Sequence, residues 1–269
     1  MPELPEVEVS RLGISPHLQH RRLQQVVVRQ RQLRWLIPDE VIALRNEPLL
    51  GVSRRAKYLL LHLPAGDILI HLGMSGNLKM LPAHTPPGKH DHVDWLLDNQ
   101  TLLRLNDTRR FGAVLWQAKG EIHPMLATLG PEPLTAEFTA EHLHQNFKKR
   151  SAAVKLVLMD NHVVVGVGNI YANEALFKAA ILPTKPAKEL TLAQCDVLVA
   201  VVKQTLASAI AQGGTTLKDF SQVDGKPGYF KQELLVYGRG NQPCLQCGTS
   251  LSELRLGQRS SVFCPTCQR

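Results

Sequence analysis

The chain has 269 residues, which is enough for one large domain or two modest ones. Hydrophobic residues make up 44% and charged residues 20%, and this composition excludes both a disordered chain and a disulfide-stapled miniprotein. Lys and Arg number 31 against 23 for Asp and Glu, so the formal net charge is +8 and a polyanionic partner is favoured. The longest stretch without any of these four residue types, residues 204–217, is shorter than the ~18 apolar residues that a membrane-spanning helix requires, so we expect no membrane span.

The first ten residues are acidic, with Glu3, Glu6 and Glu8 and no Lys or Arg. A secretory signal begins with basic residues followed by an apolar run, so we expect a cytoplasmic protein. Thiols stay reduced in that compartment. The five cysteines are therefore expected to be metal ligands or buried thiols.

The N-terminal half is predicted to be one helix followed by antiparallel strands. The helix is expected to begin near Pro5, because proline is tolerated in a first turn and apolar residues follow at roughly helical spacing. Short β-rich runs broken by turn residues come next, and their spacing indicates a sandwich or a barrel. These runs are residues 26–28, 57–63, 68–72, 93–97, 101–105 and 113–116.

Residues 130–135 are turn-rich and mark a change from strand-like to helical periodicity. The predicted helices after this point are residues 140–147, 152–159, 169–179 and 192–211, the last ended by Gly213 and Gly214. The sequence thus predicts an α+β protein with a β-rich first half and a helical second half.

Four cysteines near the C-terminus have the spacing of a zinc site. Cys244-x2-Cys247 and Cys264-x2-Cys267 each present two sulfurs from one tight turn, and two such pairs complete a tetrahedral four-cysteine shell. A closed shell leaves no position for water or substrate, so we expect one structural Zn²⁺. Two arginines, one of them Arg259, lie between the pairs in a predicted hairpin suited to a phosphate backbone, although a solvated hairpin with incidental arginines fits as well.

The chain starts Met1-Pro2-Glu3, and removal of Met1 would leave a secondary amine at Pro2. An α-amino group has an ordinary pKa of roughly 7.7–8.0 against about 10.4 for Lys, so more of it is free base near neutrality. A free amine can attack a carbon electrophile, and the prolyl adduct is an iminium that stays cationic and withdraws electrons. Glu3 offers a carboxyl group for proton transfer. The alternative is an ordinary helix start, where the helix dipole favours acidic residues.

Two turns carry basic and apolar residues that could enter a base stack. Met74 lies in the sequence His-Leu-Gly-Met-Ser-Gly at 71–76, and Arg109 and Phe111 lie in Arg-Arg-Phe-Gly at 109–112. Apolar side chains at loop tips wedge between bases in proteins that kink DNA. Partly buried loop residues are the equally good alternative. The glycines at 166 and 168 lack the third glycine of a dinucleotide fingerprint, so no nucleotide cofactor is expected.

Together these motifs resemble the formamidopyrimidine-DNA glycosylase family along the whole chain. The matching segments are Pro-Glu-Leu-Pro-Glu at 2–6, Arg-Arg-Ala-Lys-Tyr at 54–58, His-Leu-Gly-Met-Ser-Gly at 71–76, Lys-His-Asp-His-Val-Asp at 89–94, Arg-Arg-Phe-Gly at 109–112, Val-Gly-Val-Gly-Asn-Ile-Tyr at 165–171, Gly-Gly-Thr-Thr-Leu-Lys-Asp-Phe at 213–220 and the four cysteines. The resemblance implies a catalytic domain of one helix plus a β-sandwich at 1–132, a helix-two-turn-helix DNA-binding domain with a lesion loop at 133–238, and a zinc finger at 239–269.

The resemblance also implies roles for single residues. Pro2 would be the nucleophile and Glu3 the acid/base group, with Lys57 assigned to β-elimination and Arg259 to δ-elimination. The DNA contacts would be His71, His90, Arg150 and Asn169, together with Met74, Arg109 and Phe111, which would fill the space left by a flipped base. The lesion loop would carry Lys218, Gly225 and Tyr229. Thr108 stands where relatives often have Pro, which we expect to loosen the Arg109 loop.

The implied activity is that of a bifunctional DNA glycosylase and AP lyase of base excision repair, which removes oxidised purines such as 8-oxoguanine by base flipping. The implied partner is double-stranded DNA with the lesion opposite cytosine, bound by a monomer at the nucleoid, with zinc as the one cofactor. Two alternatives remain: a glycosylase of the endonuclease VIII type that prefers oxidised pyrimidines, and a zinc-containing DNA-binding protein without catalysis.

Overall fold

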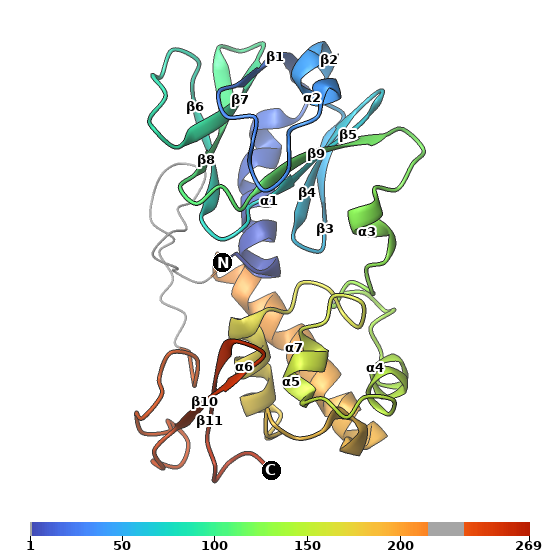
Figure 1. Ribbon diagram of the computed structural model, residues 1–269, viewed down its shortest axis with the longest axis vertical. Helices are drawn as coiled ribbons and strands as arrows, with labels where there is room; N and C mark the ends of the chain where they lie inside the picture. The colour runs from blue at the N-terminus through green and yellow to red at the C-terminus, as the bar shows by residue number, and fades with distance from the viewer. Residues whose placement is uncertain (1, 215–233) are drawn as a thin grey trace. The chain divides into compact units, whose positions relative to one another are not determined.

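A computed structural model describes residues 2–214 and 234–269 of the chain, and the structural statements below concern those two ranges. They form two compact units, which we describe separately. Residues 2–127 and 212–214 make up the sandwich unit, and residues 128–211 and 234–269 make up the helical unit. Figure 1 labels the elements of each.

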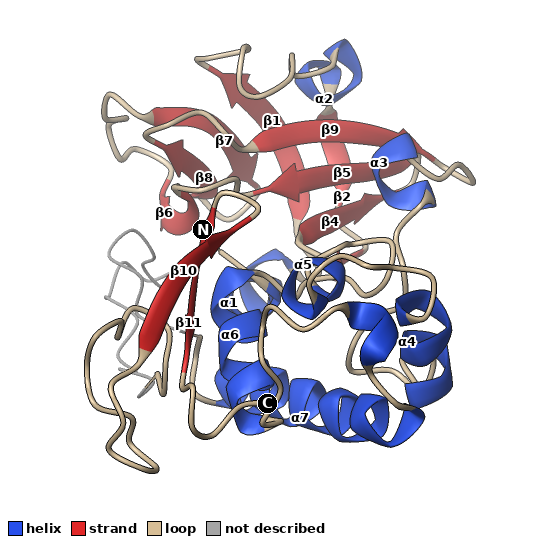
Figure 2. Ribbon diagram, turned by 60° about the horizontal axis from the view of Figure 1, so that its bottom comes forward, coloured by secondary structure: helices blue, strands red, loops and turns tan. Residues whose placement is uncertain are grey.

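The sandwich unit contains two antiparallel sheets, drawn in red in Figure 2. The five-stranded sheet has the order β2-β1-β7-β8-β6 and the four-stranded sheet the order β3-β4-β5-β9. The strands of the first sheet are β1 (Arg22–Val28), β2 (Arg45–Pro48), β6 (Gly76–Pro82), β7 (Asp91–Leu97) and β8 (Thr101–Asp107). Those of the second are β3 (Gly51–Arg55), β4 (Tyr58–Leu63), β5 (Gly66–His71) and β9 (Ala113–Ala118).

Alternating apolar residues of both sheets form one core. Every second residue of β4, namely Leu59, Leu61 and Leu63, is buried there with Trp95 of β7 and Leu103 of β8. Each such side chain contributes roughly 1.5–3 kcal/mol when it is fully buried. Helix α1 (Leu4–Leu18) adds further apolar side chains to the same core and contacts β3, β4 and β6. Two short helices, α2 (Asp39–Ala43) and α3 (Pro124–Ala127), complete the unit.

The helical unit is built around one long helix. The helices are α4 (Ala140–Phe147), α5 (Val154–Leu158), α6 (Asn169–Lys178) and α7 (Leu192–Ala211), with a 3-10 turn at Ala187–Glu189. By length and composition α7 is long and apolar enough to cross a membrane. It packs against α4 and α6, however, and Leu198, Val202 and Leu206 are buried there. It is therefore the core helix of this unit.

A two-stranded hairpin of β10 (Ser252–Leu256) and β11 (Arg259–Phe263) also belongs to the helical unit. Its strands join through Gly257 and Gln258, which both have positive φ angles, as tight hairpin turns of the mirror-image type require. Val262 packs with Phe177 of α6 and with Val236. Strand β11 thereby lies against α6.

The predicted α+β architecture is confirmed, with the helix, the antiparallel sheets, the later helices and the cysteine-bearing hairpin in chain order. Helices α4 and α7 have the predicted bounds, and α5 is shorter than predicted. Strands β2, β3 and β6 were not predicted, and in β3 the neighbouring Arg54 and Arg55 resemble a solvated charge run. In the structure Arg54 turns its guanidinium to Glu8 of α1, with Nε 2.8 Å from Oε2. The domain boundaries after residues 132 and 238 stay predictions.

Candidate functional site

The N-terminal residues Pro2 and Glu3 are buried, although they precede a helix. Glu3 is 2% exposed and Glu6 is 0% exposed. The backbone N–H of Glu3 donates a hydrogen bond of 2.9 Å to Oε2 of Glu6, one turn into α1. The Glu3 carboxylate in turn accepts the backbone N–H of Glu6, so the two acids form a reciprocal capping box directly after Pro2.

Lys57 lies in the two-residue turn between β3 and β4, after Ala56, which has a φ of 53°. Its ammonium is close to His71, at the end of β5, and it helps to hold the imidazole neutral. Burial, together with the charges of Lys57 and Arg34, lowers the pKa of His71 to about 4. Because Nδ1 of His71 accepts the N–H of Gly73 at 3.0 Å, the ring proton is on Nε2, which is left as a donor.

Arg34 is a residue of this region that sequence reasoning missed. Its guanidinium lies over the Trp35 ring, 4.6 Å from the centroid, and its backbone N–H donates to the carbonyl of Gly112. Burial raises the pKa of Tyr58, and the Arg34 charge opposes that rise. No motif in the sequence marks Arg34, because its neighbours here come from β4, β5 and the loop after β8.

The two turns singled out for base-stack insertion lie in the sandwich unit. Met74 is half-buried in the loop between β5 and β6. Arg109 is exposed in the loop between β8 and β9, and its guanidinium lies over the ring of Phe111, 4.8 Å from the centroid. The Phe111 side chain is itself 44% exposed. An exposed aromatic ring stacked by a cation is available to contact a partner.

His90 is half-buried just before β7, and its ring lies 6.4 Å from that of His92, centroid to centroid. His92 is buried, and its Nε2 donates to the carbonyl of Asp107 at 2.8 Å. The His92 ring therefore takes part in a buried hydrogen bond within the sheet, whereas the His90 ring is more exposed to solvent.

In the helical unit, Asn169 begins α6 directly after Gly168. Its side-chain Oδ1 is buried and accepts no hydrogen bond from the described residues. The first turn of a helix also presents backbone N–H groups that favour an anion. Asn169 is thus placed where a phosphate could be bound.

Arg150 has an ion pair within the unit, with one guanidinium nitrogen 2.6 Å from Oδ2 of Asp160. Burial alone would raise the pKa of Asp160, but the hydrogen bonds from Arg150 and from the backbone N–H of His162 outweigh it and lower that pKa. Arg150 is still about a third exposed, so it can reach a second anion only alongside Asp160.

Arg259 is exposed at the first position of β11, next to the hairpin turn. The strand behind it is held by buried polar side chains that sequence reasoning missed. Lys155 of α5 is 0% exposed, and its Nζ donates to the carbonyl of Ser260 at 2.7 Å and to Oγ of Ser261 at 2.6 Å. Asn173 of α6 accepts the N–H of Val262 at 2.9 Å. The backbone next to Arg259 is therefore anchored to two helices.

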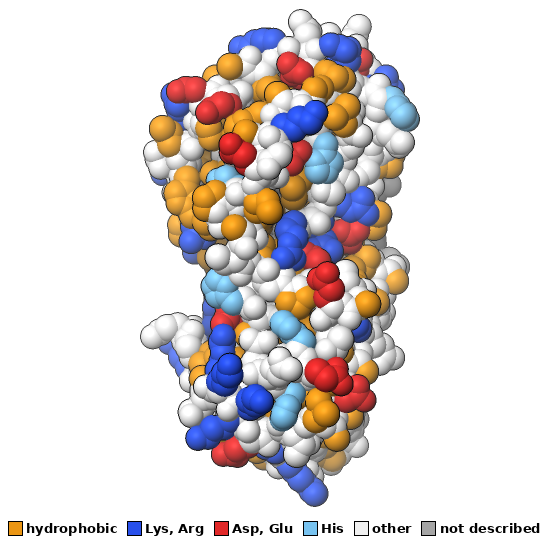
Figure 3. Space-filling view, turned by 90° about the vertical axis from the view of Figure 1, so that its right-hand side faces the viewer, with side chains coloured by type: hydrophobic (Ala, Val, Ile, Leu, Met, Phe, Trp, Pro, Cys, Tyr) orange, Lys and Arg blue, Asp and Glu red, His pale blue; other side chains and the backbone are white. Residues whose placement is uncertain are grey.

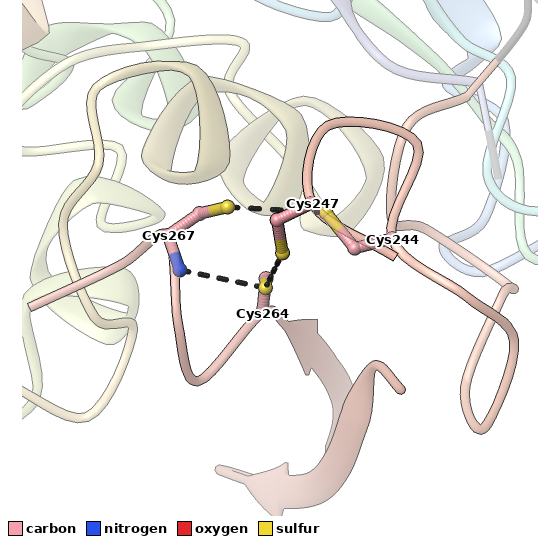
Figure 4. A group of neighbouring side chains, drawn as sticks. All are labelled: Cys244, Cys247, Cys264 and Cys267. Atoms are coloured by element: carbon pink, nitrogen blue, oxygen red, sulfur yellow. Dashed lines mark hydrogen bonds between the residues drawn. The ribbon is translucent and has the colours of Figure 1, made fainter. Parts of the chain in front are cut away.

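The four predicted zinc ligands converge. Their sulfur atoms all lie within 4.8 Å of one another, and Figure 4 shows Cys244 and Cys247 on one loop facing Cys264 and Cys267 on the other. Four sulfurs at ~2.3 Å from a tetrahedral ion would lie ~3.8 Å apart. The pairs Cys244–Cys267 and Cys247–Cys264 are 4.0 and 3.5 Å apart, so the shell fits one structural Zn²⁺.

Figure 3 shows one face of the molecule, which carries Lys and Arg side chains as well as Asp and Glu side chains. This face is mixed in charge and is not a continuous basic surface. Lys218, Gly225 and Tyr229, predicted for the lesion loop, lie outside the described residues.

Comparisons with family models match three consecutive parts of the chain. Residues 1–114 match the N-terminal domain of formamidopyrimidine-DNA glycosylase, residues 129–221 its H2TH domain, and residues 241–269 a zinc finger found in FPG and IleRS. A formamidopyrimidine-DNA glycosylase of Photobacterium damsela subsp. piscicida is 57% identical over the full length of both chains. One of Escherichia coli O6:H1 is 55% identical, also over both full lengths.

Solved structures agree in fold. The MutM (Fpg) protein of Thermus thermophilus superposes with a TM-score of 0.89 at 36% identity, covering 99% of this chain and 98% of that one. The Fpg of Lactococcus lactis, bound to DNA that contains an abasic site, superposes with a TM-score of 0.91 at 26% identity and covers 99% of both chains. A variant of the same protein bound to Fapy-dG DNA has a TM-score of 0.92 at 27% identity over the whole of both chains.

Proposed function

The chain belongs to the formamidopyrimidine-DNA glycosylase family, and on that basis we propose that it is a bifunctional DNA glycosylase and AP lyase for oxidised purines in duplex DNA. The observation that carries this proposal is the buried start of α1, where Pro2 and Glu3 stand beside Glu6. The reaction is a Schiff base at Pro2 followed by β,δ-elimination.

In the first step the Pro2 nitrogen, freed by loss of Met1, attacks C1′ of the damaged nucleotide. The bond from C1′ to the base breaks as the base takes a proton, and Glu3 is the acid/base group for this transfer. The Pro2 nitrogen loses its proton, and the C1′–O4′ bond then breaks as O4′ takes a proton from Glu3, which opens the sugar ring. The product is an iminium at C1′ that has no N–H proton to lose, so it draws electrons from C2′. A proton then leaves C2′ and the 3′ phosphate departs.

Lys57 and Arg259 are proposed to assist the two eliminations. Lys57 is close enough to His71 for its charge to act on the imidazole, so both groups would contact the same nucleotide. Arg259 would hold the phosphate that departs in δ-elimination. Its exposed guanidinium, on a strand anchored by Lys155, suits that role.

Phosphate contacts are proposed for His71, His90, Arg150 and Asn169. Support comes from the neutral His71 with its Nε2 donor and from the position of Asn169 in the first turn of α6, where backbone N–H groups favour an anion. For Arg150 the contact would have to coexist with its ion pair to Asp160. Because phosphate contacts release counterions, DNA affinity should fall steeply with salt.

Met74, Arg109 and Phe111 are proposed to fill the space that a flipped purine leaves, with Arg109 bound to the opposite cytosine. The stacked Arg109 and Phe111 pair supports this role. A damaged base leaves the duplex at lower cost than an intact one. Lys218, Gly225 and Tyr229 would contact the extruded base. The protein would act as a monomer in the cytoplasm, at the nucleoid.

The proposal is tested by comparing incision of duplexes that carry 8-oxoguanine opposite cytosine or thymine glycol opposite adenine. We expect faster incision of the first. Faster incision of thymine glycol would make the protein an endonuclease VIII-type enzyme, and binding without incision of either would make it a DNA-binding protein. Glu3→Gln should lower excision by ~10²–10⁴-fold. Glu40→Gln, an exposed acid of the same unit, is the matched control and should change nothing.

A further inference from the structure

Asp107, the last residue of β8, is a buried carboxylate without a role in the mechanism above. It is 0% exposed. One carboxylate oxygen, Oδ1, accepts the hydroxyl of Ser75 at 2.6 Å, and the other, Oδ2, accepts the backbone N–H of Gly112 at 2.7 Å. Ser75 follows Met74, and Gly112 follows Phe111. One side chain thus bridges the two loops proposed to enter the DNA.

The same pair also holds the backbone of Arg109. The Arg109 N–H points between Oγ of Ser75, at 3.1 Å, and Oδ1 of Asp107, at 3.3 Å. Asp107 is itself fixed through its main chain, because its N–H donates to the carbonyl of His90 and its carbonyl accepts from His92. The position of Arg109 is therefore tied to strands β7 and β8 and not to the loop alone.

A second, independent observation joins the two loops. Gly73 has a φ of 61°, and a Cβ added to it would lie 2.3 Å from the carbonyl carbon of Phe111 and 2.5 Å from the nitrogen of Gly112. The backbones of the two loops are thus in direct contact. The carboxylate supplies the polar link between them and the glycine permits the close approach.

The chemistry of the donors shows why a carboxylate is needed. A fully buried charge is costly unless donors surround it. Within the described chain, the Asp107 carboxylate is bound by the Ser75 hydroxyl and the two loop N–H groups of Arg109 and Gly112. All of these are neutral donors, so the charge is used to order the loops and not to pair with a cation. An amide would present its NH₂ group to at least one N–H or O–H donor.

We propose that Asp107 and Ser75 are positioning residues that lock the Met74 loop and the Arg109–Phe111 loop into one rigid body, and thereby set the preference for the base opposite the lesion. The inference rests on the proposed function of Arg109. Thr108 stands where relatives often have a proline, and we expected this change to loosen the loop. The hydrogen bonds from the Arg109 N–H to Ser75 and Asp107 restrain the next residue and so offset that loosening.

The test measures kcat/KM for duplexes with 8-oxoguanine opposite cytosine and opposite adenine. We expect Asp107→Asn to lower the cytosine-to-adenine ratio about tenfold, the size expected for loss of a hydrogen bond to a charged group. Ser75→Ala, which keeps the carboxylate, should lower it by a smaller factor. The fall in the cytosine-to-adenine ratio should come from kcat for the 8-oxoguanine duplexes. As a further measurement, KM for a duplex with an abasic site should change little. The control Asp98→Asn, the same change at an exposed turn of this unit, should leave the ratio unchanged.

The variant Arg109→Ala distinguishes an error in the positioning role of Asp107 and Ser75 from an error in the proposed role of Arg109. If Arg109→Ala lowers the ratio and both Asp107→Asn and Ser75→Ala leave it unchanged, the positioning role is wrong and the proposed function stands. If Arg109→Ala leaves the ratio unchanged, the role of Arg109 is wrong and the positioning role falls with it. Should Asp107→Asn fail to fold, as judged by tryptophan emission, Ser75→Ala decides the question.

Discussion

Arg109 in the sandwich unit and Arg259 in the helical unit are both exposed arginines beside tight turns, yet they are held by different means. The Arg109 loop is tied by a buried carboxylate and a close glycine contact to strands of a large core. The Arg259 hairpin has only two strands and a few apolar contacts, and it depends on four cysteines and on Lys155 and Asn173.

The difference follows from the size of the core behind each arginine. A sandwich of nine strands buries enough apolar surface to support a loop held by hydrogen bonds alone. A two-stranded hairpin is marginal by itself and needs a metal or a docking partner. The sandwich unit behind Arg109 and the hairpin that carries Arg259 should therefore differ in how metal removal, loss of an ion pair, loss of Lys155 and acid affect their stability.

Metal removal gives the largest expected effect, and it is confined to the helical unit. Structural zinc supplies ~10–16 kcal/mol of apparent binding free energy, more than the other contacts of such a hairpin. Chelation should abolish DNA binding and unfold the hairpin. The tryptophans Trp35, Trp95 and Trp116 all lie in the sandwich unit, so their emission should not change. A red shift of that emission on chelation would contradict the separation, and added Zn²⁺ should restore binding.

Breaking the buried ion pair of Asp94 and Arg104 should affect the sandwich unit alone. Nε of Arg104 lies 2.7 Å from Oδ1 of Asp94, and both side chains are about 2% exposed. Asp94→Asn leaves the buried Arg104 with the more distant Asp91 carboxylate, 3.4 Å away, as its charge partner, so it should lower the free energy of unfolding by up to about 3–5 kcal/mol. Tryptophan emission in a urea titration measures it.

The control for this variant is Asp39→Asn, which breaks an exposed pair with Arg31 in the same unit and should cost less than about 1 kcal/mol. Zinc retention should be equal in both variants. Loss of zinc from Asp94→Asn would show that the hairpin depends on the sandwich after all.

Lys155→Met should disturb the hairpin without removing its metal. The variant loses the bonds to Ser260 and Ser261, which at about 1.5–3 kcal/mol each for a charged donor should loosen β11 behind Arg259. We expect faster amide exchange in β11 and fewer δ-elimination products relative to β-elimination products. Lys188→Met, an exposed lysine of the same unit, is the control. Equal product ratios for the two variants would argue against anchoring by Lys155.

Acid should weaken the sandwich unit in two ranges of pH. The pKa of His71 is about 4 in the folded state against an ordinary value of about 6.5, so the unfolded state binds more protons between these pH values and stability is lost as pH falls from 6.5 to 4.

The second range belongs to Asp94. Burial raises its pKa, but hydrogen bonds from Arg104 and Arg29 outweigh burial and hold it below its ordinary value. Its contribution is present above the unfolded pKa of about 3.9 and is lost as pH falls through the folded pKa. Denaturation midpoints against pH check both ranges, and His71→Gln should abolish the first only. A flat profile from pH 6.5 to 4 would contradict the burial of His71.

The features that were predicted from the sequence are those with local signals. Helix α4 follows Thr139, whose hydroxyl caps it, and α7 ends before Gly213 and Gly214, so both had markers at their ends. The zinc site was predictable because each cysteine pair lies within one turn. The fold class followed from the change in periodicity near residue 130.

The features that were missed depend on residues far apart in the chain. Lys155 and Ser260 are 105 positions apart, and Ser75 and Asp107 are 32 apart. A buried Lys or Asp has no periodic or compositional mark, because its burial depends on partners that folding brings to it. The contacts of residues that position a site have no sequence signal for this reason. Pro2, Lys57 and the cysteines belong to motifs; the cysteine site is confirmed, and the roles of Pro2 and Lys57 stay predictions.

The central claim, that the secondary amine of Pro2 forms the covalent intermediate, is tested most directly by borohydride reduction during the reaction with an 8-oxoguanine duplex. Peptide mass spectrometry then locates the reduced sugar. The account predicts one adduct, on the nitrogen of Pro2, and none when that nitrogen has been acetylated. An adduct on Lys57, or incision at an unchanged rate by the acetylated protein, would contradict it.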